Sequence, residues 1–459
     1  MPYNHTTFAE AKQHLANELG DPGKVFFVDH ELGRYIVEAL RWWGLVAQYF
    51  RETGRVTTVA GQSFYYLENS LFNGLGTTLL QGLTVTDREL INDINYALME
   101  PQISAWAGGW VGTEMFSLED LAETIESSRD ECLKLTASIA EGFDLGVTGS
   151  RVDLPSDHIR ILRADINEAG SSGPLPLFVD DQVQIYTTFK SSANPQPGRP
   201  KAYAVSYSPQ LTVDLWPLPS TVATLNIQGI KSGGVLDPTV SPTVLKVPDD
   251  ASVILKYRTL ADLFGEDGLA RAPQMAQYCE MRYQEGLEAM GRYLSILWQN
   301  DGGPRGQITT ISQWDQNRPT WRQGPNGTPR SVAQLNWNTI GVRPRPDGAH
   351  VMTFETIRKA PIPTVDGDFI QVGREHIGAI YDYAVHIALV KSQGVEFEIT
   401  MPRYESAKAM AEEYRLQVAS QSYLYQATQL PSLQEKWFRP LRKQAGVVAS
   451  QEDRQLVEA

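Results

Sequence analysis

The chain has few of the residues that catalytic and metal sites require. Its 459 residues include two cysteines and seven histidines, and neither set shows the close spacing of metal ligands. A phosphate-binding glycine loop, a G-x-S-x-G elbow and an H-E-x-x-H pair are all missing. The sequence therefore predicts a protein that is not an enzyme, with no catalytic residue, cofactor or metal. Cys132 and Cys279 lie in helical patterns, so we expect buried free thiols.

Long apolar segments are missing as well. No run approaches the roughly 20 residues that a membrane span needs, and the N-terminal segment is amphipathic rather than a secretory signal. The 40 basic residues are outnumbered by 54 acidic ones, which gives a formal charge of −14. This balance argues against gripping nucleic acid through its phosphates, but it suits a channel that DNA slides through. We expect a soluble protein, made in the cytoplasm, with no membrane partner.

Aromatic residues are plentiful, and the hydrophobic period changes along the chain. The sequence holds 10 Trp, 19 Tyr and 15 Phe, and its length exceeds what a single core usually serves. Helical periodicity gives way to strand-like alternation after about residue 150 and then returns. We therefore expect an α+β protein, in which a helical-bundle core carries an inserted small antiparallel β-sandwich or barrel and long irregular loops.

Six regions follow from these changes of pattern. The first half consists of N-terminal helices with a β-hairpin at 55–67 (1–145) and an inserted β domain (151–245). The second half consists of a helical hairpin (246–299), an extended Gly-, Pro- and Trp-containing loop region (300–366), a second helical hairpin (367–428) and a C-terminal tail (429–459).

The hairpin in region 246–299 is the clearest local pattern. Asp249 and Asp250 stand before its first helix, where free N–H groups and the helix dipole favour acidic side chains. Apolar residues follow at helical spacing, and Pro273 suits the first turn of the return helix. The second hairpin repeats this pattern more loosely, with Pro402 expected near the start of its second helix.

Two groups of aromatic residues are candidate contact sites. In the loop region, burial at a subunit or tail interface is favoured over stacking on a sugar, because aromatics are enriched at protein interfaces. These tryptophans are Trp314, Trp321 and Trp337. In the C-terminal tail, an aromatic anchor flanked by arginines favours a docking peptide over a plain surface tail. Its residues are Trp437, Phe438, Arg439 and Arg442.

Asp180 and Asp181 are the acidic pair that best fits acid–base catalysis. They precede a predicted strand, and two carboxylates on a β scaffold are the pair that glycosidases use. A turn or cap role explains the pair more simply, so a glycan hydrolase is the weakest of the functional readings.

Two segments resemble a known family. The hairpin sequence VPDD…LKYRTLADLFGEDGLARAPQMAQYCEMRYQEG and the N-terminal TFAEAKQHLANELGDPGKVFFVDHELGRYIVEALRWW are similar to the head-to-tail adaptors (connectors) of tailed bacteriophages. In this resemblance, the N-terminal segment is a short helix, a loop and a helix capped by Asp29. The similarity covers residues 6–50 and 246–297 well and the second hairpin loosely.

The resemblance implies a virion structural protein without catalytic residues. Such adaptors form a homo-oligomeric ring, commonly of twelve subunits, between the portal and the tail, and DNA passes the lumen without specific binding. Portal, tail-tube or nozzle and fibre proteins are then the expected partners, and the C-terminal cluster becomes a candidate for portal docking. The alternative is a tail, neck or fibre-attachment protein that recognises carbohydrate through the β insert and the loop tryptophans.

Overall fold

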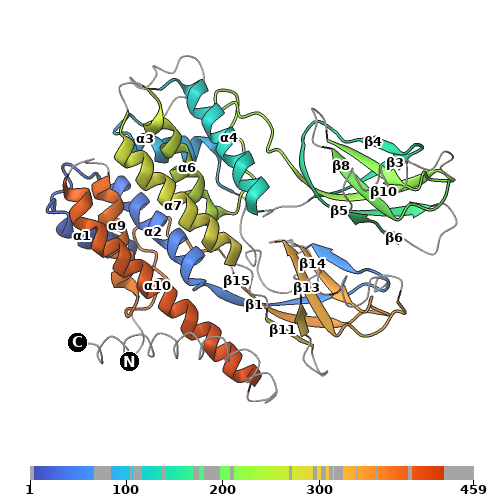
Figure 1. Cartoon of the computed structure of the whole chain (residues 1–459). Coiled ribbons are helices and arrows are strands. Elements are labelled where there is room, and N and C mark those ends of the chain that lie inside the picture. The colour runs from blue at the N-terminus through green and yellow to red at the C-terminus, as the bar shows by residue number, and fades with distance from the viewer. Residues whose placement is uncertain are drawn as a thin grey trace, which may run out of the picture.

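The computed structural model describes most of the helical and β regions of the chain. The described residues are 5–66, 84–103, 106, 116–136, 141–168, 175–179, 197–206, 211–267, 271–292, 297–300, 307–309, 314, 324–336, 339–357, 359–390 and 395–427. Figure 1 shows a lobe of helices on one side of the molecule and two β regions on the other. The α+β class predicted from the sequence is confirmed.

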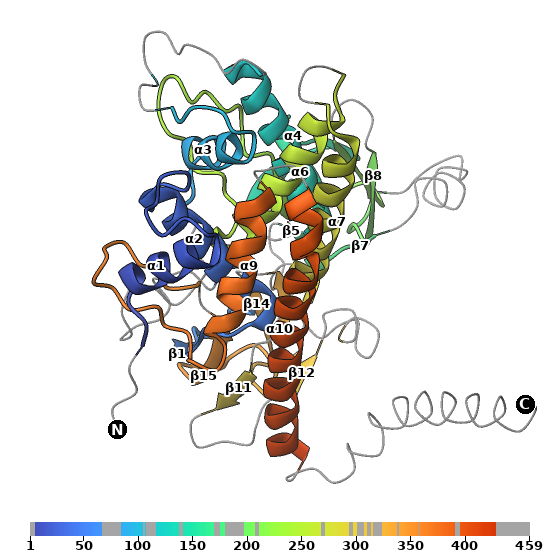
Figure 2. The same cartoon turned by 90° about the vertical axis from the view of Figure 1, so that its left-hand side faces the viewer.

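The helical lobe is built on two hydrophobic cores. One core lies among α3 (Asp87–Ala97), α4 (Leu118–Thr136), α6 (Ser252–Gly265) and α7 (Pro273–Arg292). The other lies among α1 (Phe8–Glu18), α2 (Asp29–Ala47), α9 (Ile377–Val390) and α10 (Val395–Ala427). Figure 2 shows α9 and α10 side by side, with α10 continuing beyond the end of its neighbour.

Both predicted helical hairpins form, with one difference in the second. α6 packs on α7, and α9 packs on α10. Pro402 lies inside α10 rather than near its start, because the helix already begins at Val395. The position of Pro402 suggested that the second helix begins near residue 402, but the helix extends further toward the N-terminus.

The inserted β region is a sandwich of two four-stranded sheets. One sheet has the order β3-β10-β5-β6, from β3 (Glu141–Val147), β10 (Ala223–Lys231), β5 (His158–Glu168) and β6 (Leu175–Pro176). The other has the order β4-β9-β8-β7, from β4 (Arg151–Asp153), β9 (Thr212–Trp216), β8 (Ala202–Ser206) and β7 (Phe178–Val179). Among the described residues both sheets are open, so the barrel alternative is wrong. Their pairs are antiparallel except β7 with β8, which is parallel.

The second β region joins strands that are distant in sequence. One sheet has the order β1-β15-β11, from β1 (Arg51–Thr57), β15 (Val351–Ile357) and β11 (Leu297–Asn300). The other has the order β12-β13-β14-β2, from β12 (Gln307–Thr309), β13 (Ser331–Asn336), β14 (Thr339–Arg343) and β2 (Phe64–Tyr66). Part of the region expected to be irregular loop is therefore regular sheet.

The predicted hairpin at 55–67 is wrong in its pairing. Its two strands form, but β1 pairs with β15 and β2 pairs with β14. Alternating side chains specify that a segment is a strand and which face is buried, but they do not specify its partner. Here the partners are supplied by strands nearly 300 residues later in the chain.

Three acidic residues lie at helix N-termini as expected, but their carboxylates bind other chain segments and do not cap the helices. The cap of α2 is Val28 and that of α6 is Ala251, and neither makes a side-chain capping bond. Asp29 forms ion pairs with two lysines, one of them from α1. Asp249 and Asp250 lie in a short 3-10 turn (Asp249–Ala251) before α6 and accept hydrogen bonds from distant chain segments.

Asp249 illustrates what these acids do. Its carboxylate accepts the backbone N–H of Thr84 at 2.6 Å and pairs with Lys359 Nζ at 3.2 Å. Burial alone would raise the pKa of Asp249, but these hydrogen bonds and the lysine outweigh burial and lower it. The ionised carboxylate thus holds together three parts of the chain that enter the helical lobe separately.

Candidate functional site

Arg282 lies at the centre of the helical lobe, where α2, α6, α7, α9 and α10 meet. Its side chain is buried, although arginine is rarely buried without partners. On α7, the residues Tyr278, Arg282 and Glu285 are spaced by four and three positions, so they share one face of the helix. That face points into the junction of the five helices.

Four tyrosine rings surround the Arg282 guanidinium. Its Cζ lies 4.2 Å from the ring centre of Tyr404, 4.5 Å from Tyr257, 5.0 Å from Tyr383 and 5.7 Å from Tyr278. The guanidinium also donates to the hydroxyls of Tyr278 at 2.7 Å and Tyr383 at 2.5 Å. Stacked rings and donated hydrogen bonds together compensate for removing the charge from water. We call this group the arginine cage.

Two glutamates complete the arginine cage. Glu285 lies 3.9 Å from Arg282 Nε, pairs with Lys408 Nζ at 2.6 Å and accepts a hydrogen bond from Tyr404. Glu38 of α2 accepts from the Tyr257 hydroxyl at 2.9 Å and forms an ion pair with Lys256. These contacts connect all five helices through charged or charge-assisted hydrogen bonds.

The phenols of the arginine cage act as hydrogen-bond groups rather than as bases. Burial raises the pKa of Tyr257 and Tyr383 well above the ordinary value. Both therefore remain protonated at physiological pH and keep donating to their acceptors. In the described residues, the arrangement holds helices in a fixed relation and presents no activated nucleophile.

His386 extends the network through α9. It is fully buried, with Nε2 2.8 Å from the Tyr278 hydroxyl and Nδ1 3.0 Å from Thr400 Oγ1. Burial, with the charge of Arg282 nearby, lowers the pKa of His386 to about 3. The imidazole is therefore neutral at physiological pH, one ring nitrogen donating and the other accepting.

A cleft of about 90 Å³ opens beside the arginine cage. Trp42 and Ile254 supply part of its apolar wall, and Glu285 and Lys408 supply charged groups. Gly286 lies at the closest approach of α6 and α7, because a Cβ atom there would meet the Ile254 side chain at 2.6 Å. A larger residue at position 286 would separate the two helices.

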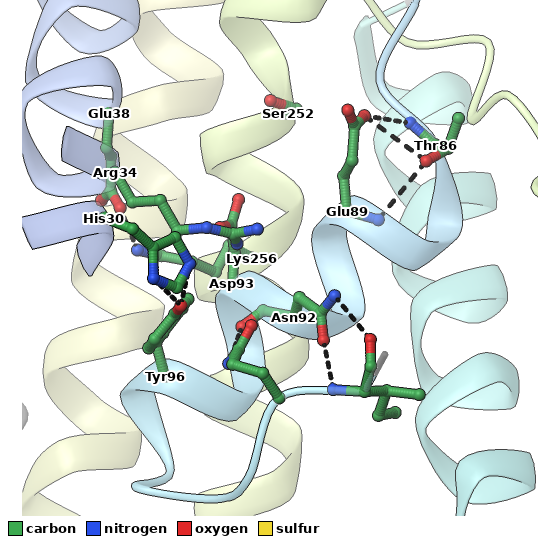
Figure 3. Close-up of polar contacts among 12 residues, drawn as sticks. His30, Arg34, Glu38, Thr86, Glu89, Asn92, Asp93, Tyr96, Ser252 and Lys256 are labelled. Atoms are coloured by element: carbon green, nitrogen blue, oxygen red, sulfur yellow. Dashed lines mark hydrogen bonds and ion pairs between the residues drawn. The ribbon is translucent and has the colours of Figure 1, made fainter. Parts of the chain in front are cut away.

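Two further polar contacts join α2 to α3 (Figure 3). Arg34 pairs with Asp93, and His30 meets the Tyr96 hydroxyl. Burial raises the pKa of Asp93, and the charge of Arg34 opposes that rise. These contacts fix α3 against the rest of the lobe.

The N-terminus of α3 carries a capping box. Figure 3 shows Thr86 and Glu89 bonded reciprocally, as the spacing of a hydroxyl and an acid three residues apart requires. The Asn92 side chain then accepts the backbone N–H of Ile103 at 3.0 Å, which anchors the chain after the helix.

Trp314, one of the predicted interface tryptophans, lies in the second β region. It is 2% exposed and packs with Ala333 and the partly buried Phe64 in a small core of the second β region. Residues of the same chain cover the ring, so little of its surface is exposed to another subunit or to a sugar. The remaining predicted site residues lie outside the described residues: Trp321, Trp337, Trp437, Phe438, Arg439, Arg442, Asp180 and Asp181.

The two cysteines are buried and free, as the sequence predicts. Burial raises the pKa of the Cys132 and Cys279 thiols to about 12, so both stay protonated and unreactive at physiological pH.

The arginine cage was not identified from the sequence. The spacing of its tyrosines indicates apolar helical stripes, and an isolated arginine next to such a stripe usually indicates a side chain that reaches the surface. The available signal was the spacing of Tyr278, Arg282 and Glu285, which places an aromatic, a cation and an anion on one helical face.

The described part of the chain holds neither a metal-binding cluster nor a membrane-spanning helix. No group of three His, Cys, Asp or Glu side chains is placed to hold a metal ion there. None of the helices there is both long enough and apolar enough to cross a membrane. No protein-family model matches the sequence, and no curated protein matches it significantly.

Proposed function

We propose that this chain is a structural protein of a tailed-phage virion, a head-to-tail adaptor that forms a homo-oligomeric ring between portal and tail. The observation that carries the proposal is the arginine cage. It locks the α6–α7 hairpin, the segment with the family resemblance, to α2, α9 and α10. A ring subunit under load needs helices held in one register, and a buried polar network specifies register more strictly than apolar packing does.

A rigid apolar loop before α2 supports self-association. The Asp21 carboxylate accepts the backbone N–H groups of Val25 at 3.0 Å, Phe26 at 2.8 Å and Phe27 at 2.9 Å. Phe27 is buried, whereas Val25 is 85% and Phe26 61% exposed. Single exposed apolar residues are common, but an aromatic tip on a braced loop is typical of an interface anchor. The proposed occupant of this contact is a second copy of the chain.

The charge of the chain is compatible with a DNA channel. A formal charge of −14 disfavours tight binding to phosphates, so DNA would pass a lumen without specific contacts. The portal and the tail tube, nozzle or fibre proteins are the proposed partners, and twelve is the subunit count that the resemblance implies.

Particle shape tests the proposal most directly. Negative-stain electron microscopy and light scattering of the purified chain, alone and mixed with its portal protein, should show rings or portal-capped rings. Phe26→Asp should shift the rings to smaller species while leaving far-ultraviolet circular dichroism unchanged. Val240→Asp is the matched control, since Val240 is 77% exposed in a different loop. Monomers that persist with and without portal would contradict the adaptor.

The C-terminal cluster is tested separately. Deleting residues 430–459 should weaken binding to portal, because the cluster of Trp437, Phe438, Arg439 and Arg442 would be lost. Ring formation and the helical circular dichroism signal should remain. Unchanged portal affinity would remove the docking role of the tail without affecting the proposal for the ring.

A further inference from the structure

We propose that the outer face of the β3-β10-β5 sheet, where it meets β2, is a binding pocket for a neutral saccharide. This inference is independent of the proposed adaptor function. The strand register places two rows of three residues on that face, and each row crosses the sheet from β3 through β10 to β5. Asn226 lies between Asp144 and Asp165, and Gln228 lies between Gly142 and Arg163. Because side chains alternate along a strand, the residues between them face the core of the sandwich.

The pocket at this face has a volume of about 260 Å³. Its wall comes from these two rows, from Phe143 and Ile227 between them, and from Phe64, which belongs to β2 of the other β region. Its size is just below the roughly 300–1,000 Å³ of sites for drug-sized ligands, which suits a single sugar ring.

The polar groups of the pocket are held in place before a ligand arrives. Arg163 Nη2 donates to both carboxylate oxygens of Asp165, at 2.8 and 2.9 Å, and the guanidinium lies 4.4 Å from the centre of the Phe64 ring. The Asn226 amide donates to Asp144. Fixed donors and acceptors reduce the ordering cost of binding.

Gln228 supplies an acceptor that the described residues leave unsatisfied. Its Oε1 atom is buried and has no hydrogen-bond partner among them. A buried acceptor without a partner costs free energy, and a rotation of the Gln228 amide toward the pocket would let a ligand hydroxyl recover it. This atom marks the side of the pocket at which a donor group is required.

The chemistry of the pocket selects neutral polyhydroxyl compounds. Vicinal hydroxyls both donate and accept, and here they would meet carboxylates, amides and a guanidinium within two adjacent rows. Asp144 and Asp165 repel phosphates and carboxylates, and the charge of Arg163 is already matched by Asp165.

The test uses the full chain and four probes, the methyl glycosides of glucose, galactose, mannose and N-acetylglucosamine. Saturation-transfer NMR should detect binding of at least one glycoside at millimolar concentration, and titration calorimetry should give its affinity. Asn226→Ala and Gln228→Ala should each weaken that affinity about fivefold to tenfold. Thr224→Ala is the matched control and should bind normally. Thr224 lies on the same strand and face but opposite Gly146 and Asn167, outside the pocket.

Three results would overturn the proposal. The first is the absence of binding for all four glycosides. The second is binding that Asn226→Ala and Gln228→Ala leave unchanged, which would place the sugar elsewhere on the chain. The third is displacement of the glycoside by inorganic phosphate, which would make the pocket an anion site. Thermal unfolding of each variant checks that the sandwich remains folded.

Discussion

The helical lobe buries charged side chains in its interior, whereas the described β10 strand of the sandwich carries its polar side chains on the outer face. Arg282 is 4% exposed, whereas the sandwich core consists of apolar residues and one tyrosine. β10 alternates buried Leu225 and Ile227 with the outward Asn226 and Gln228. The two regions thus use the same residue types for different purposes.

The two arrangements have different consequences for the lobe and for the sandwich. In the lobe, a charge removed from water must be matched on every side, so the five helices are fixed in one relation. In the sandwich, apolar residues alone hold the sheets together, and the polar face is left available for a ligand. A region stabilised by internal polar contacts suits mechanical assembly, and one with ordered polar rows on its surface suits recognition.

Removing the central charge should have the largest effect. Arg282→Met leaves the buried hydroxyls of Tyr278 and Tyr383 without their donor and leaves Glu285 with Lys408 as its cation, so we expect a loss of about 3–5 kcal/mol in the free energy of unfolding of the lobe. Urea unfolding followed by the helical circular dichroism signal measures it. Arg271→Met is the control. Arg271 is exposed and pairs with the exposed Asp267, so its loss should cost less than about 0.5 kcal/mol. Equal stability of the two variants would contradict the role of the cage.

A cavity in the sandwich should have the next largest effect and should leave the lobe unchanged. Leu225 is fully buried, so Leu225→Ala should destabilise the sandwich by about 3 kcal/mol. Calorimetry should show one transition shifted to lower temperature and the transition of the lobe unmoved. Thr224→Ala, one residue earlier and on the opposite face, should shift neither. A joint shift of both transitions would show that the two regions unfold as one unit.

Acid should weaken the lobe more than the sandwich. The folded pKa of His386, about 3, lies below its ordinary value of 6.5. The unfolded chain therefore binds a proton below pH 6.5 that the folded chain does not, so this stabilisation is complete above that pH and is lost as the pH falls. The loss is about 2 kcal/mol between pH 7 and pH 5. Urea unfolding across this range measures it, and His386→Gln should flatten the dependence.

His350→Gln provides the control for acid sensitivity. His350 is partly exposed and pairs with Asp347 in the second β region, away from the arginine cage. Its replacement should leave the pH dependence of the helical lobe as it is. If the free energy of unfolding of His386→Gln still falls between pH 7 and pH 5, groups other than His386 cause the acid sensitivity.

Local patterns in the sequence predicted local structure well. The apolar spacing along α6, α7 and α9 predicted these helices, and the alternation from Ala223 to Ile227 predicted strand β10. The hydroxyl of Thr86 and the carboxylate of Glu89 gave the capping box. In each case the determining contacts lie within a few residues of one another.

Features that depend on distant residues were not predicted. β1 and β2 find their partners in β15 and β14, and neither partner can be inferred from the strands themselves. The acids before α6 looked like caps because the segments they bind, near Thr84 and Lys359, are far away in sequence. The arginine cage needs four helices besides its own, so no local pattern could reveal it.

The attachment of the sandwich to α4 has a consequence for how this chain could change over evolutionary time. Asp130 accepts the Ser232 hydroxyl at 2.8 Å, and Arg129 donates to the Gly234 carbonyl at 2.6 Å. A side chain at Gly233 would collide with Arg129, so the returning chain is held against α4 at this point. The ends of the sandwich therefore meet at one anchored junction, as the ends of an insertable module do. A different module could replace it there, giving related chains different ligands on one unaltered helical frame.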